Sequence, residues 1–379
     1  MSKNHPTSTG FQSYLVWLAS FTLAVCVAIP SRTEADSPRE ASVRKSANRA
    51  IEYLKARGQA ADGSFSRESG SAVTSLCVAA ILKHRPEAKR DPVIAKAISF
   101  IESNFRGDGG IYAEGSKYKN YETCIATAAL LEANENGKYD SVLARAKAFI
   151  KDEQWGEGEG LTASDPAYGG AGYGGHSRPD LSNTAFMIES LRNLGDDADD
   201  EAIQKAMLFV ARTQNLTGQG NDTKHAELVG DGGFYYTPAA GGTSQAGNTA
   251  NGGLRSYASM TYAGLKSMIF AGLTPDDPRV EAALTFIRKN YDLKSNPGLG
   301  TAGLYYYYHT FAKSLDVAKI EILDDAEGKP HAWRDELVET LVTAQSEDGS
   351  WINSANDRWM EGNPNLVTAY ALLALAYCK

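Results

Sequence analysis

Six stretches of this sequence resemble one another, and each is long enough for a helix yet almost free of charged residues. They share an anchor position, which is threonine in five stretches and tyrosine in one, and a large apolar residue seven positions later. A helix that is apolar on all sides has to be enclosed by other elements, so every repeat predicts an enclosed helix. The stretches are 71–83, 121–133, 181–194, 256–271, 303–315 and 365–377, with anchors at Thr74, Thr123, Thr184, Thr261, Tyr308 and Thr368.

A second set of six segments alternates with the first and is amphipathic. Apolar residues recur there at helical spacing, as at Val93, Ala97 and Ile101, with charged residues between them. A helix with a charged stripe faces water on that side. We therefore expect six inner and six outer helices, the all-α architecture called an (α/α)6 toroid. The outer helices are expected at 42–57, 91–105, 138–154, 200–214, 277–292 and 331–345.

The predicted toroid is closed, in contrast to an open solenoid of helix pairs. The last inner stretch, 365–377, contains no charged residue and is not followed by a polar capping repeat. In an open solenoid, a terminal helix of this composition would face water along one side. Packing of the last pair against the first removes that exposure.

The first 35 residues have the features of a secretory signal. Lys3 precedes an apolar run at 14–29, and small residues precede a predicted cleavage point after Ala35. The run is short for a membrane span, which needs about 20 residues. We expect a signal peptide at 1–35, a short linker at 36–41 and one toroid domain at 42–379, in a protein exported to the periplasm or the extracellular space. The alternative is an uncleaved segment, which would be the protein's one contact with a membrane.

The charge balance limits the partners of the chain. It has 46 acidic and 38 basic residues, a formal net charge of -8. Without a basic excess to neutralise phosphates, nucleic acid is not an expected partner. A composition of 42% hydrophobic and 22% charged residues also excludes a disordered chain.

The long connections of the predicted toroid gather at one rim. Segments 106–120, 155–180, 215–255 and 346–364 are glycine-rich and each leads from an outer into an inner helix. The return connections are mostly short turns, with 316–330 as the exception. Long loops on a rigid scaffold commonly carry function, so we expect the site at this rim. The positive N-terminal ends of six inner helices also point there and would favour an anionic group.

A short sequence of the form Asp-Gly-Ser/Gly-aromatic precedes several inner helices. It begins at Asp62, Asp108, Asp231 and Asp348. Glycine permits a tight turn and the aspartate hydrogen-bonds its own backbone, so we interpret the repeat as a structural turn, here called the clip.

The fullest clip, at 345–351, reads Gln-Ser-Glu-Asp-Gly-Ser-Trp and is similar to the QW repeat of squalene–hopene-type cyclases. Repeated around six helix pairs, it makes residues 42–379 resemble the terpenoid cyclase and protein prenyltransferase superfamily. That resemblance implies an isoprenoid chain bound in a central, aromatic-lined cavity.

The catalytic groups of that superfamily are not matched in their expected places. Its cyclases use an acid in an Asp-x-Asp-Asp sequence on an inner helix, whereas the string at 197–200 opens an outer helix and is predicted to be a cap. Its prenyltransferases hold zinc with Asp, Cys and His, of which only His309 has a counterpart here. We therefore predict no cofactor; the alternative is zinc held by His176, His225 and His309.

The candidate site residues come from the stretch 303–315 and from the loop rim. Tyr308 and His309 are the candidate catalytic pair, because imidazole titrates near neutrality and a tyrosine hydroxyl can relay a proton. A purely structural role is the alternative for these residues. The tyrosines could simply pack between helices, and Asp180 could simply cap the helix that begins at 181. The candidate ligand-binding residues are Tyr257, Tyr262, Tyr305, Arg178, Asp180, Asp357, Arg358 and Trp359.

Three functions remain open from the sequence. The first is binding, with or without transformation, of a small hydrophobic ligand such as an isoprenoid. The second is a polysaccharide lyase or glycosidase acting on a glycan, which would need a proton-abstracting pair or two facing carboxylates. The third is a non-catalytic platform that binds a partner through the loop rim. A deep aromatic cavity would favour the hydrophobic ligand, and an open charged groove would favour the glycan. A filled centre would leave only the platform.

Overall fold

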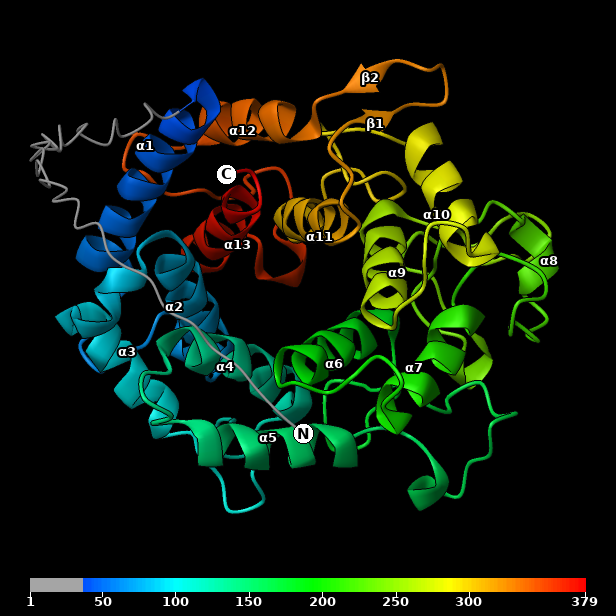
Figure 1. Cartoon of the computed structure of the whole chain (residues 1–379), viewed down its shortest axis with the longest axis horizontal. Coiled ribbons are helices and arrows are strands. Elements are labelled where there is room, and N and C mark those ends of the chain that lie inside the picture. The colour runs from blue at the N-terminus through cyan, green and yellow to red at the C-terminus, as the bar shows by residue number, and fades with distance from the viewer. Residues whose placement is uncertain (1–36) are drawn as a thin grey trace, which may run out of the picture. The chain divides into compact units, whose positions relative to one another are not determined.

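A computed structural model of the chain describes residues 37–379, and the predicted signal segment lies outside them. In the described part, six helices form an inner ring and six others surround it (Figure 1). The inner helices are α2 (Ala72–His84), α4 (Lys119–Ala133), α6 (Leu181–Asn193), α9 (Ala258–Phe270), α11 (Leu304–Val317) and α13 (Pro364–Ala376). The outer helices are α1 (Pro38–Tyr53), α3 (Pro92–Glu102), α5 (Asp140–Asp152), α7 (Glu201–Arg212), α10 (Pro278–Lys289) and α12 (Trp333–Ala344).

The inner ring is closed. Each inner helix contacts the next along the chain, and α13 contacts α2, while α1 packs on α12 and α13. Every residue of α13 from Leu366 to Leu375 is buried, whereas α3 buries only one face, at Ile94, Ala97, Ile98 and Ile101. The predicted (α/α)6 toroid is therefore confirmed, with the charge-poor helices inside.

The first helix starts earlier than expected. Residues 38–41, predicted as linker, belong to α1, because Ser37 and Glu40 form a capping box. The Ser37 hydroxyl accepts the Glu40 N–H at 3.2 Å, and the Glu40 carboxylate accepts the Ser37 N–H at 2.8 Å. This reciprocal cap, with Pro38 in the first turn, moves the boundary toward the N-terminus.

The threonine anchors have one shared role. In five repeats, the anchor hydroxyl accepts a hydrogen bond from a backbone N–H in the loop that precedes the inner helix. The bonds run from Phe65 to Thr74 (2.9 Å), Ile111 to Thr123, Ala171 to Thr184, Phe234 to Thr261 and Trp351 to Thr368 (3.0 Å each). The sixth anchor, Tyr308, instead donates to the Leu293 carbonyl at 2.7 Å. Each threonine thus fixes the end of a loop to the top of its inner helix.

In three of the four clips, a glutamine ties the clip to the neighbouring outer helix. The Gln345 side-chain amide donates to the Gly349 carbonyl at 2.8 Å and to the Ser46 carbonyl in α1 at 3.0 Å. Gly349 has a φ of 93°, and a Cβ there would lie 2.4 Å from the Arg49 carbonyl oxygen, so only glycine fits. The bonds of Gln345 join the last repeat to the first. Gln59, Gln154 and Gln214 make the same pair of bonds in their own repeats.

The remaining elements are short. The connection 316–330 leads into a two-stranded hairpin, in which β1 (Leu323–Asp324) pairs antiparallel with β2 (Pro330–His331). The helix α8 (Ala226–Val229) interrupts the loop before α9. From residue 37 onward, no helix is both long and apolar enough to cross a membrane.

Replacing one anchor hydroxyl should lower stability without altering volume. We predict that Thr123→Val reduces the free energy of unfolding by about 1–3 kcal/mol, because the buried Ile111 N–H loses its acceptor. Urea unfolding monitored by circular dichroism measures this change. The matched control is Thr285→Val, whose exposed hydroxyl bonds only the Glu281 carbonyl and which should change stability by less than about 0.5 kcal/mol. Equal effects at both sites would contradict the proposed role of the anchor.

Candidate functional site

A cavity of about 470 Å³ lies at the N-terminal ends of the inner helices. All six inner helices contribute to its wall, and each does so with the residue two positions before its anchor. These residues are Ala72, Tyr121, Ser182, Ser259, Tyr306 and Leu366. The cavity, here called the central pocket, therefore follows the repeat of the sequence.

Aromatic residues are the largest class of side chain in the wall of the central pocket. Nine of its 23 lining residues carry an aromatic ring, and loops supply five of these nine. Aromatic faces bury large apolar areas, while the tyrosine hydroxyls need polar partners. The Ser182 and Tyr306 hydroxyls lie 3.0 Å apart, for example. The aromatic lining residues are Tyr118, Tyr121, Tyr173, Phe186, Tyr236, Tyr257, Tyr306, Trp359 and Tyr370.

Part of the mouth is formed by a strained loop. Trp359 and Met360 both have left-handed backbone conformations, with φ of 57° and 67°, although neither is glycine. Both line the pocket, and they are 43% and 44% exposed. Arg358 stacks on the Trp359 ring at 4.1 Å and donates to the Gln245 amide oxygen at 2.5 Å. Backbone strain of this kind clusters at ligand clamps and switch regions, which supports a functional role for the loop.

Asp180 is buried beside the pocket. Its carboxylate accepts the Asn183 backbone N–H at 3.0 Å and so caps α6, as one interpretation of the sequence predicted. Burial raises the pKa of Asp180 to about 6, although hydrogen bonds from Asn183 and Tyr236 oppose that shift. Tyr236 lines the pocket and also hydrogen-bonds Tyr173. A hydrogen-bonded chain therefore connects the carboxyl group to the pocket wall.

Below the pocket lies a buried charge cluster. Glu189 accepts hydrogen bonds from Lys266 and Lys313, and all three side chains come from inner helices. Burial alone would raise the pKa of Glu189, but the two ammonium groups hold it well below its usual range. The Lys266 ammonium also lies 5.7 Å from the centre of the Phe186 ring, which separates it from the pocket.

The structure does not bring the candidate catalytic pair together. The Tyr308 hydroxyl donates to the Leu293 carbonyl, and His309 stacks on Tyr370, with ring centres 5.8 Å apart. Burial and the nearby Lys313 lower the pKa of His309 to about 3, so it is neutral at pH 7. Neither residue lines the pocket. At about 100° per residue, Tyr308 points roughly 160° away from the pocket-lining Tyr306, whereas His309 lies on the same side as Tyr306 but about one turn further along α11.

The structure places the candidate ligand-binding residues in different environments. Tyr257 and Trp359 line the central pocket. Tyr262 and Tyr305 are buried in the packing around α11, with Tyr262 against Phe311 and Tyr305 against Tyr308. Asp180 is a cap beside the pocket, and Arg178 and Arg358 are exposed beyond its wall, where they lie near the rings of Tyr236 and Trp359.

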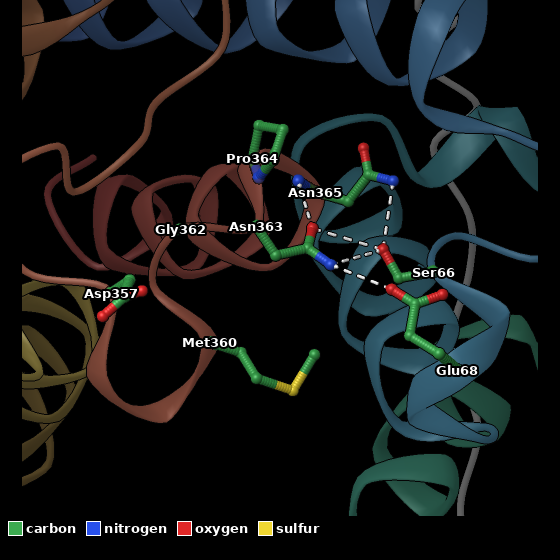
Figure 2. Close-up of a pocket in the computed structure, with 8 residues that line it drawn as sticks. All are labelled: Ser66, Glu68, Asp357, Met360, Gly362, Asn363, Pro364 and Asn365. Carbon is green, nitrogen blue, oxygen red and sulfur yellow. Dashed lines mark hydrogen bonds between the residues drawn. The ribbon is translucent and has the colours of Figure 1, made fainter.

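Asp357 lies in a second, open cleft of about 570 Å³ at the junction of the first and last repeats. Figure 2 shows its polar side, where Asn363 at the start of α13 hydrogen-bonds Ser66 and Glu68. Met360 and Glu68 line both the cleft and the central pocket, so the two spaces adjoin.

The residues of the alternative zinc site have separate partners. His176 lies 3.3 Å from Glu159, His225 contacts the Gly241 carbonyl, and His309 stacks on Tyr370 near the charges of Lys313, Glu189 and Lys266. In residues 37–379, no group of three or more His, Cys, Asp or Glu is placed to hold a metal ion. The positive charge of the lysine ammonium groups near His309 would repel a zinc ion, so these residues do not fit zinc.

The Asp-x-Asp-Asp string at 197–200 is a cap, as predicted. The Asp200 carboxylate accepts the Ala202 N–H at 3.0 Å at the start of α7 and pairs with Lys151 at 2.8 Å. It lies on an outer helix and does not line the pocket.

The sequence reasoning missed most of the pocket wall. Tyr121, Tyr306 and Ser182 were not selected, although the anchor alignment contains the signal, since position −2 lines the pocket in every repeat. Tyr173 and Tyr236 come from loops, where no periodicity could have identified them.

The titration of Asp180 gives a test of its burial. Because its folded-state pKa is raised, its contribution to stability is full below about pH 4 and is lost as the pH rises through about 6. Asparagine also caps helices but cannot ionise. We measure the free energy of unfolding of Asp180→Asn and of the parent protein by urea unfolding at each pH. The difference, variant minus parent, should rise by about 2–3 kcal/mol between pH 4 and pH 7, because the parent loses the contribution of Asp180 over that range.

The matched control is Asp200→Asn on the outer helix α7. Lys151 and backbone hydrogen bonds lower the pKa of Asp200 despite its partial burial. Its contribution is therefore present at neutral pH and lost on acidification, and this variant should show no gain from pH 4 to pH 7. A flat response of Asp180→Asn would refute the raised pKa.

Comparison with known proteins agrees with this architecture. The family model of the squalene-hopene cyclase C-terminal domain matches residues 67–237. Among curated protein sequences, none matches this chain.

Solved structures share the fold at low identity. Variants of the type II terpene cyclase MstE from Scytonema, one with the product merosterolic acid A and one with the substrate geranylgeranyl dihydroxybenzoate, superpose with TM-scores of 0.55 and 0.54 at 15% identity, covering 90% of this chain and 98% of theirs. A protein from Actinoplanes has a TM-score of 0.50 at 12% identity, covering 89% of this chain and 99% of its own. The resemblance to the terpenoid cyclase superfamily predicted from the sequence is thus confirmed, and residues 37–379 have the fold of that superfamily.

Proposed function

We propose that the central pocket binds an isoprenoid-like or other apolar ligand. The observation that carries this proposal is the pocket itself, whose wall is drawn from all six inner helices and is rich in aromatic rings. Its volume of about 470 Å³ falls in the range of about 300–1,000 Å³ typical of small-molecule sites.

The structural neighbours add a second line of support. The MstE variants were solved with a geranylgeranyl-bearing substrate and with a merosterolic acid product. A protein with the same fold and an aromatic pocket is suited to similarly apolar chains, because ring faces pack closely on hydrocarbon.

The glycan alternative has less support from the site. A glycosidase needs two facing carboxyl groups with free oxygens. Three acidic residues of the rim already accept structural hydrogen bonds. Asp180 caps α6, Asp231 accepts from the Ser256 hydroxyl, and Glu361 accepts from the Tyr305 backbone N–H. A filled centre would have left only the partner-platform alternative, and the central pocket leaves the ligand-binding functions open as well.

If the bound ligand is transformed, Asp180 is the group best placed to act as an acid. Its pKa of about 6 leaves a fraction protonated at neutral pH, and Tyr236 connects it to the pocket. This assignment replaces the pair of Tyr308 and His309, which has no shared hydrogen bond and no access to the pocket wall.

Export remains part of the proposal. It rests on the signal-like features of residues 1–35, as does the restriction of membrane contact to an uncleaved N-terminal segment. The expectation that nucleic acid is not a partner rests instead on the net charge of -8.

Mass spectrometry of molecules extracted from the natively purified protein tests the proposal. We expect a stoichiometric apolar ligand, and titration with farnesol should change the tryptophan fluorescence of the protein, to which Trp359 in the pocket wall contributes. The variant Ser182→Trp places a large ring in the pocket and should weaken farnesol binding at least about tenfold, since bound chain and ring compete for one volume. The control Thr285→Trp adds the same ring on the exposed side of α10 and should bind like the parent. No binding of farnesol or any extracted lipid by the parent would overturn the proposal.

A further inference from the structure

At the positive end of every inner helix, the protein itself already supplies an oxygen that accepts a backbone N–H. The sequence suggested that these six ends would favour an anionic group. In the structure, a backbone N–H in the first turn of each inner helix, or just before it, donates to an oxygen of the chain itself.

Carboxylates occupy three of these ends. The Ser71 N–H before α2 donates to Glu122 at 2.8 Å, α6 is capped by Asp180, and the Tyr305 N–H in α11 donates to Glu361 at 2.8 Å. Each places a carboxyl group where a ligand anion would otherwise bind.

Neutral oxygens occupy the other three ends. The Ser259 N–H of α9 donates to the Asn296 amide oxygen at 3.1 Å, and the Asn365 N–H of α13 donates to Asn363 at 2.9 Å. In α4, the Asn120 N–H donates to the Tyr173 carbonyl at 2.9 Å.

The charges that line the pocket have one sign. Glu68, Glu122 and Glu361 are among its lining residues, whereas no lysine, arginine or histidine is. The faces of aromatic rings add negative potential, which attracts cations and repels anions.

The positive groups nearest to the pocket lie behind its wall or outside it. Arg358 and Arg178 are near the rings of Trp359 and Tyr236, and neither lines the pocket. Lys266 and Lys313 lie below the pocket and share Glu189, leaving one net positive charge there. These positive charges would attract an anionic ligand, but aromatic rings separate them from the pocket.

We propose that the central pocket accepts uncharged or cationic isoprenoid-like ligands and rejects anionic ones, such as prenyl phosphates and prenyl carboxylates. The inference rests on the proposed function and adds the charge class of the ligand. It separates this chain from MstE, whose named substrate is a benzoate.

Three ligands with one chain isolate the effect of charge. Binding of farnesol, farnesyltrimethylammonium and farnesyl phosphate is measured by titration calorimetry below their aggregation concentrations. We expect farnesyltrimethylammonium to bind at least as tightly as farnesol, and farnesyl phosphate at least about tenfold more weakly. Equal or tighter binding of the phosphate would overturn the inference and leave the proposed function standing, whereas failure of all three ligands would overturn the proposed function.

A variant tests whether the caps cause the rejection. Glu361→Gln keeps an oxygen for the Tyr305 N–H but removes the charge. It should reduce the ratio of the dissociation constants of farnesyl phosphate and farnesol, here called the gap, by roughly threefold to tenfold. Glu40→Gln makes the same change at the exposed cap of the outer helix α1 and should leave the gap unchanged. An unchanged gap in Glu361→Gln, with the fold verified by its melting temperature, would contradict the role of the caps.

Discussion

The hydrogen bond between the anchor hydroxyl and the preceding loop holds the site together. At Thr123 and Thr184, for example, the hydroxyl accepts a hydrogen bond from a backbone N–H of the loop that precedes the inner helix. A buried N–H without an acceptor is costly, so this bond determines where each loop ends relative to its inner helix. Because the residue two positions before the anchor lines the pocket, the same bond also orients the pocket wall. Stability and binding geometry therefore depend on one contact, repeated around the ring.

Closure of the ring places six helix N-termini around one space, and that concentration of positive ends has an electrostatic cost. The chain offsets it with its own oxygens, among them the buried carboxylates of Glu122 and Glu361. Neutralised ends and aromatic walls produce a pocket suited to apolar chains. The fold brings the helix dipoles together, and the capping groups determine the charge of the ligand that the pocket can bind.

Much of the architecture could be predicted, and part of the site could not. The inner helices were identified because a helix without charges must be enclosed, and α13 is indeed buried from Leu366 to Leu375. The run of tyrosines before Tyr308 was harder to interpret, since successive residues sweep around the helix and the choice of the inward one depends on its exact orientation. Tyr306 faces the pocket, whereas Tyr308 and His309 do not.

The sequence alone determined the repeat, the sorting of helices into two layers and the rim on which the long loops gather, because these follow from local periodicity and composition. Only the tertiary structure decided which side chains meet. Tyr173 and Tyr236 reach the pocket from loops, and Glu361 caps a helix that begins 57 residues earlier, at Leu304. Such contacts join segments far apart in the chain, and they exist only once closure of the ring has brought the loop ends together.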